Sequence, residues 1–136
     1  MRCGIMINIC DLLAGKSNFH HLTSGADLDK IREAEESLGV VFSQEYKEIT
    51  SKYGAVSFGI HELTGVCDSK RLNVVETTER ERSYNDTIPA NMYLIEVTGM
   101  EDVTVWQAED GKIYRISYHK DPVLIAESLY QYIELS

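Results

Sequence analysis

The stretch from Leu28 to Gly54 constrains the fold of this chain more than any other part of its sequence. In its first half, apolar residues recur at the three- and four-residue steps of one helical face: Leu28, Ile31, Ala34 and Leu38. In its second half a similar stripe is formed by Tyr46, Ile49 and Tyr53. Two such short helices are not stable alone in water, so the rest of the chain must supply a sheet on which they pack.

The residues that flank these two helices are typical of helix ends. Ser24 or Asp27 is positioned to cap the first helix and Ser43 the second, because their side-chain oxygens accept from unpaired backbone N–H groups. Gly39 follows the first helix, where a left-handed residue commonly ends a helix, and Gly54 follows the second. The boundaries of both helices are therefore predicted from local signals alone.

Most of the remaining chain is predicted to be strands. Alternating or short apolar runs indicate strands at 55–60, 63–66, 92–98, 103–107 and 112–117. Asp110-Gly111 predicts a type I′ hairpin, so the last two strands pair antiparallel. In the 92–98 strand, simple alternation places Glu96 on the face of Met92 and Leu94, opposite Tyr93 and Ile95.

Three further helices complete the predicted fold. They cover residues 8–14, residues 74–82 after a capping box begun by Asn73, and a C-terminal segment begun by Asp121-Pro122. The paired residues His20 and His21 are expected in a loop. We therefore predict one α+β domain over residues 1–136, in which the helix pair and the C-terminal helix pack on an antiparallel-rich sheet.

The charge of the chain is acidic and unevenly spread. The net charge of the 136 residues is −9, and residues 76–110 hold nine acids against two bases. Such a chain is not expected to bind nucleic acid directly, because phosphate binding needs clustered Lys and Arg. An acidic surface attracts a basic protein and speeds its encounter, although a solvated surface that maintains solubility is the simpler alternative.

The cysteines indicate a reducing compartment, and the first residues do not have the pattern of a membrane or signal segment. Cys3, Cys10 and Cys67 are odd in number and lack metal-ligand spacing, so we interpret them as reduced, unreactive thiols. The apolar run at 3–10 is too short for a membrane span and lacks a signal-peptide cleavage site. We therefore expect a cytoplasmic protein that does not contact a membrane.

No catalytic motif is found in the sequence. It lacks a P-loop, a dinucleotide-binding glycine pattern, a CxxC pair, an HExxH pair and a nucleophile elbow. His61 beside Glu62 and His119 near Asp121 could act as acid–base pairs, but neither has an evident nucleophile. Trp106 is either a core residue or a binding anchor. We predict no enzyme activity, no cofactor and no metal site, with a small hydrolase using either histidine as the weakest alternative.

A set of mostly core-type residues occurs in a defined order across the helix pair and the strand after it: Ile31, Glu35, Leu38, Gly39, Phe42, Tyr46, Tyr53, Gly54, Phe58 and Gly59. A second set follows later: Ile88, Pro89, Tyr93, Leu94, Ile95 and the strand pair around 110–114. In order and spacing, both sets resemble the SUKH superfamily over residues 26–135, after an N-terminal helix and loop at 1–25. One position departs from the family pattern, because Ser43 stands where a proline usually opens the second helix.

The resemblance implies a binding module. The SUKH superfamily includes immunity proteins of bacterial polymorphic toxin systems and yeast cell-wall-synthesis regulators. The first group implies that this chain neutralises a cognate toxin, and a nuclease toxin would offer a cationic surface to an acidic partner. The second implies a regulatory scaffold that binds host proteins. From charge and expected exposure, we predict that the toxin contacts are Glu79, Glu81, Asp86, Glu101, Asp102, Glu109 and Asp110.

Overall fold

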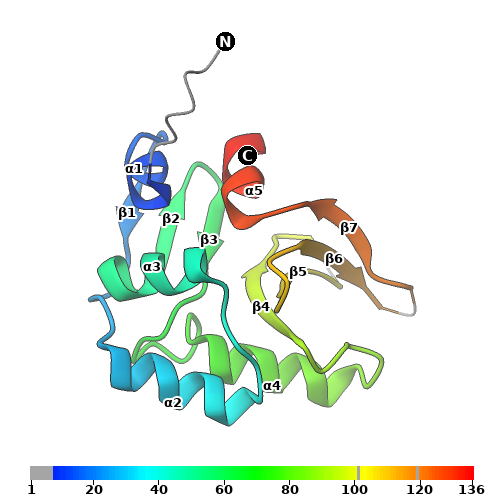
Figure 1. Cartoon of the computed structure of the whole chain (residues 1–136). Coiled ribbons are helices and arrows are strands. Elements are labelled where there is room, and N and C mark those ends of the chain that lie inside the picture. The colour runs from blue at the N-terminus through cyan, green and yellow to red at the C-terminus, as the bar shows by residue number, and fades with distance from the viewer. Residues whose placement is uncertain (1–7, 101, 119) are drawn as a thin grey trace.

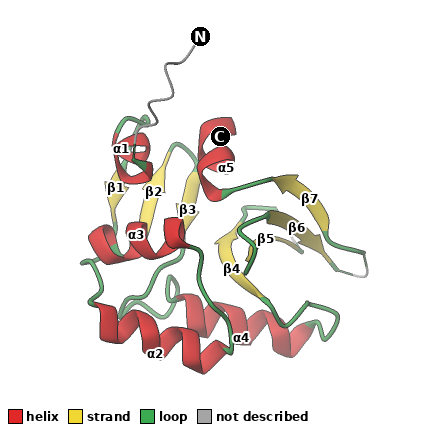
Figure 2. Ribbon diagram, viewed as in Figure 1, coloured by secondary structure: helices red, strands yellow, loops and turns green. Residues whose placement is uncertain are grey.

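The computed structural model describes residues 8–100, 102–118 and 120–136. Figures 1 and 2 show the arrangement of its helices and strands. The helices are α1 (Ile9–Ala14), α2 (Leu28–Leu38), α3 (Gln44–Tyr53), α4 (Val74–Tyr84) and α5 (Leu129–Leu135). The strands are β1 (His20–His21), β2 (Val56–Phe58), β3 (His61–Leu63), β4 (Met92–Val97), β5 (Val103–Ala108), β6 (Ile113–Ser117) and β7 (Val123–Ala126). The predicted α+β class is therefore confirmed.

The strands form two antiparallel sheets. One has the order β1-β2-β3 and the other the order β4-β5-β6-β7. The sheets meet where Thr64, just after β3, donates its N–H to the Ile95 carbonyl at 2.9 Å and its hydroxyl to the Leu94 carbonyl at 2.7 Å. This contact covers the β4 edge of the larger sheet, so the two sheets share one core.

The predicted helix pair is confirmed, with its caps. Asp27 accepts from the Lys30 N–H and Ser43 from the Tyr46 N–H, which satisfies one unpaired donor in each first turn. Gly39 ends α2 with φ of 69°, a conformation that costs glycine little because it has no Cβ. The predicted stripe of α2 is wrong at Leu28, which is 68% exposed.

The helices are divided between two regions of the molecule. α2 and α4 lie side by side along the bottom of Figure 1, whereas α1, α3 and α5 pack together beside the smaller sheet. The main core lies between these helices and both sheets, and includes Tyr46, Phe58, Tyr93 and Ile133. A smaller apolar cluster on the opposite face of the larger sheet contains Trp106, which is fully buried and is therefore a core residue.

A β-bulge in β4 overturns the predicted alternation. Leu94 pairs with Trp106 and Glu96 pairs with Val105, so Ile95 is the extra residue between them. Val105 belongs to the main core, and the bulge therefore turns Glu96 toward that core rather than toward Met92 and Leu94. Glu96 is only 4% exposed.

The hairpin between β5 and β6 uses a different turn from the predicted type I′. Gly111 has φ of 93°, but Asp110 is not among the residues with positive φ. The Gly111 N–H donates to the Ala108 carbonyl at 2.8 Å and the Ala108 N–H to the Lys112 carbonyl at 2.9 Å. This is the three-residue loop in which a type I turn is followed by a left-handed glycine.

Three other segments differ from their predicted structure. The predicted helix from Asp121 is wrong: residues 123–126 form β7 on β6, and α5 begins later, capped by Ser128. Pairing with β6 stabilises a strand here in spite of the local helix-start signal. The prediction missed this strand because a local helix pattern carries no information about a distant strand partner. His20 and His21 form β1 rather than a loop, and β3 occupies His61–Leu63 rather than 63–66.

Candidate functional site

The first possible site is the connection between α2 and α3, where three successive backbone N–H groups are each bound by a side chain. The Val41 N–H donates to Glu109 at 2.8 Å, the Phe42 N–H to Glu35 at 2.8 Å and the Ser43 N–H to the Tyr93 hydroxyl at 2.8 Å. The bonds to Glu109 and Tyr93 hold the loop on the larger sheet, and the bond to Glu35 holds it on α2. Glu109, one of the predicted toxin contacts, therefore has a structural partner.

Asp110 lies in the same turn as Glu109. Its carboxylate accepts from the Lys112 N–H at 3.0 Å and lies 4.0 Å from the Lys112 ammonium, so it stabilises the β5–β6 hairpin locally. The turn that contains Asp102 is at the other end of β5. A six-residue strand rises about 17 Å, so the predicted contacts Asp102 and Asp110 cannot form one compact cluster.

A second region brings together residues that are distant in sequence. Glu81 and Tyr84 of α4 and Asp102 of the β4–β5 turn all lie close enough to Tyr118 to affect its ionisation. Desolvation raises the pKa of the Tyr118 phenol, and the negative charges of Glu81 and Asp102 raise it further. We call Glu81, Tyr84, Asp102 and Tyr118 the Tyr118 patch.

The members of the Tyr118 patch differ in accessibility. Tyr84 is 68% exposed and Asp102 is also exposed. The Glu81 side chain is only 14% exposed and lies 4.0 Å from the Arg80 guanidinium, so it contributes its charge from the base of the patch. Asp102 has φ of 63°, a left-handed conformation that most non-glycine residues avoid.

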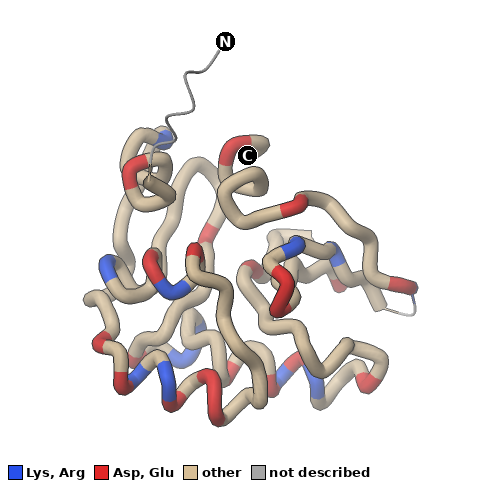
Figure 3. Tube along the Cα trace, viewed as in Figure 1, with Lys and Arg blue, Asp and Glu red and all other residues tan. Residues whose placement is uncertain are grey.

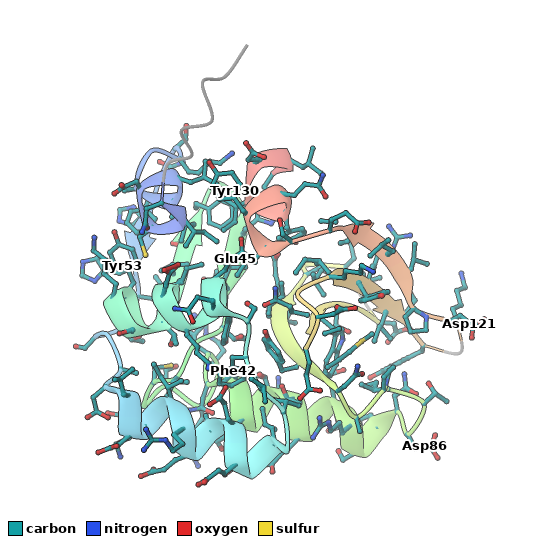
Figure 4. All side chains as sticks on the ribbon, viewed as in Figure 1. Phe42, Glu45, Tyr53, Asp86, Asp121 and Tyr130 are labelled. Carbon is teal, nitrogen blue, oxygen red and sulfur yellow. The ribbon has the colours of Figure 1, made fainter. Side chains whose placement is uncertain are left out.

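The other predicted contacts lie elsewhere. Glu79 precedes Glu81 by two residues on α4, and at 100° per residue the two side chains point about 200° apart. Asp86 lies in the loop beyond the end of α4, at the lower right of Figure 4. Glu101 lies outside the described residues. Of the seven predicted contacts, Glu81 and Asp102 both lie within electrostatic reach of Tyr118, and Glu109 and Asp110 share the β5–β6 turn.

Acidic residues are not confined to the 76–110 segment. Figure 3 shows acidic positions along α2 as well, where Asp29, Glu33 and Glu36 are exposed. A docking site on this molecule is therefore not defined by total charge. What distinguishes the Tyr118 patch is the combination of carboxylates with two tyrosine rings.

A buried carboxylate that sequence reasoning did not identify lies at the junction of the sheets with α5. Glu96 accepts a 2.5 Å hydrogen bond from the Tyr132 hydroxyl and lies 3.0 Å from Nδ1 of His61. Burial and the Glu96 charge raise the pKa of the Tyr132 phenol well above its usual range. Only the bulge at Ile95 gives Glu96 this orientation, so local sequence carried no signal for it.

This cluster corrects the predicted acid–base pair. His61 pairs with Glu96, whereas Glu62 forms an ion pair with Arg71 at 2.5 Å. Within the described residues, the hydrogen bonds of the His61 ring go to the Glu96 carboxylate. His119 lies outside the described residues. The arrangement of His61, Glu96 and Tyr132 ties α5 to both sheets and supplies no nucleophile.

A cleft of about 570 Å³ lies between the first turns of α2 and α4 and the loops that precede them. Its lining mixes polar and apolar surface and includes Asp27, Lys30, Glu33, Cys67, Asp68 and Glu76. Burial raises the pKa of the Cys67 thiol, which lowers its reactivity at neutral pH. Among the described residues, no three His, Cys, Asp or Glu side chains are arranged to hold a metal ion.

The helices of the described chain are all too short or too polar to cross a membrane. The described residues form two antiparallel sheets, and Glu35 holds the connection between α2 and α3. A family model described as SUKH_6, SMI1-KNR4 cell-wall, matches residues 28–133, most of the chain. The chain belongs to this family, and through it to the SUKH superfamily.

Comparison with solved structures supports the same fold. A crystal structure of a protein from Pseudomonas syringae pv. tomato is similar, with a TM-score of 0.71 over 93% of both chains. Its sequence identity is 18%, so this likeness concerns the fold. No curated protein matches the sequence.

Proposed function

We propose that this chain is an immunity protein of the SUKH type, which binds and neutralises a bacterial toxin by protein–protein contact. The toxin is proposed to be a nuclease-type domain with a basic surface, and the protein acts in the cytoplasm without catalysis. The observation that carries this proposal is the match to the SUKH family over residues 28–133. The exposed Tyr84 and Asp102 of the Tyr118 patch suggest where the toxin docks, because tyrosines are enriched at binding hot spots and carboxylates steer a basic partner.

The conformation of Asp102 also supports this location. A left-handed aspartate is less favourable than glycine at the same position, and residues held in such conformations cluster at functional sites. The Thr98 hydroxyl donates to the Met100 and Val103 carbonyls, one on each side of this position. Asp102 itself is exposed to solvent.

Co-expression with the toxin tests the proposal. The toxin domain for this test would be the C-terminal part of a large toxin-like protein encoded beside this chain, and growth of the co-expressing cells reports neutralisation. We expect the unaltered protein to restore growth. The Glu81→Gln/Asp102→Asn variant should protect cells less, and Asn is chosen because it tolerates the left-handed conformation.

The matched control removes the same charge from another surface. Glu33 and Glu36 are exposed on α2, and the Glu33→Gln/Glu36→Gln variant should protect as well as the unaltered protein. Equal protection by both double variants would overturn the patch as the docking surface. Failure of the unaltered protein to protect would overturn the immunity function itself.

A regulatory scaffold is the second candidate. The description of the matched family names the cell wall, which favours a regulatory domain that binds host proteins. The Tyr118 patch would serve such a partner equally well. Two results together would support this alternative. The chain would leave toxin activity unchanged, and it would co-purify with a cell-wall synthesis protein in a way that requires Tyr84.

A further inference from the structure

We draw no further inference here: the strongest candidate, the cleft between the first turns of α2 and α4, is lined by acidic side chains, by Lys30 and by the positive ends of two helices, so its charges oppose one another and nothing in the described part of the chain shows which ligand would occupy it.

Discussion

Replacing Glu96 by leucine removes the buried carboxylate that joins the two sheets to α5. The substitution is close in size, so little of its effect comes from a cavity. It leaves the Tyr132 hydroxyl without its 2.5 Å acceptor and His61 without its 3.0 Å partner. We therefore expect a large loss of stability from a single side chain that the sequence pattern assigns to the opposite face of β4.

The size of the loss follows from the contacts. A buried donor left without its acceptor costs about 1–3 kcal/mol, so the loss of the Glu96 acceptor for both Tyr132 and the partly exposed His61 should cost about 3 kcal/mol. A hydrogen bond to a charged group is worth about 2 kcal/mol, so Tyr132→Phe alone should cost about that much. Once Glu96 is absent, Tyr132→Phe should cost almost nothing, which gives a coupling energy of about 2 kcal/mol.

Urea denaturation of the four proteins in this double-mutant cycle measures the coupling. With a slope of about 2 kcal/mol per molar urea, Glu96→Leu should lower the midpoint by about 1.5 M. The control is Glu36→Leu on the exposed face of α2, which should change the unfolding free energy by less than about 0.5 kcal/mol.

Additive effects of Glu96→Leu and Tyr132→Phe would refute this reasoning, because they would mean that the two side chains do not bond. A loss of unfolding free energy below about 1 kcal/mol for Glu96→Leu would also refute it, because replacing a solvent-exposed carboxylate has an effect of that small size. Either result would mean that Glu96 does not make the buried contacts that the bulge at Ile95 gives it.

Two further predictions concern α5 and the buried tyrosines. Glu45 accepts from the Leu129 and Tyr130 N–H groups at 3.1 and 3.2 Å, so Glu45→Gln should cost about 1 kcal/mol and speed amide exchange in α5 more than in α2. Alkaline pH should also destabilise the protein, because the pKa of each of three phenols is raised in the folded state while the unfolded phenols lose protons near pH 10. These tyrosines are Tyr46, Tyr93 and Tyr132. The three tyrosines contribute their full stabilisation below pH 10, and above it each loses about 1.4 kcal/mol of stabilisation per pH unit. Urea midpoints measured at rising pH would show this loss. A midpoint that does not change with pH would contradict the prediction.

The elements that the sequence predicted well are those whose boundaries depend on neighbouring residues. Asp27 and Ser43 cap their helices as expected, and Gly39 adopts the expected left-handed conformation. These features depend on hydrogen bonds within one helical turn. The identity of Asp110-Gly111 also predicted a hairpin correctly, although it did not specify the turn type.

The elements that were missed depend on distant partners. Residues 123–126 begin with a proline-marked helix signal but pair with β6, and the register of that pairing is not encoded locally. Likewise, the bulge at Ile95 comes from the fit of β4 to β5 and reverses the direction of Glu96. Simple alternation has no means of anticipating one extra residue.

In the candidate site, too, the features set by neighbouring residues could be predicted and those set by distant partners could not. Sequence composition drew attention to an acidic segment, but its residues separate in space because β5 carries Asp102 and Asp110 to opposite ends of the sheet. Glu81 and Asp102 both come within electrostatic reach of Tyr118 only in the folded chain, in which α4 packs on β4. An aromatic residue among the acids, such as Tyr84, is the one local signal that could have pointed to this surface.

The most direct test of the immunity proposal is the rate at which the purified protein associates with the adjacent-gene toxin domain as salt is raised. We predict a tight complex in which the toxin is inactive, with an association rate that falls steeply with ionic strength. The Glu81→Gln/Asp102→Asn variant should associate more slowly and with a weaker salt dependence than the Glu33→Gln/Glu36→Gln control. The absence of a complex, or an association rate that does not change with salt or with the two patch charges, would contradict the account.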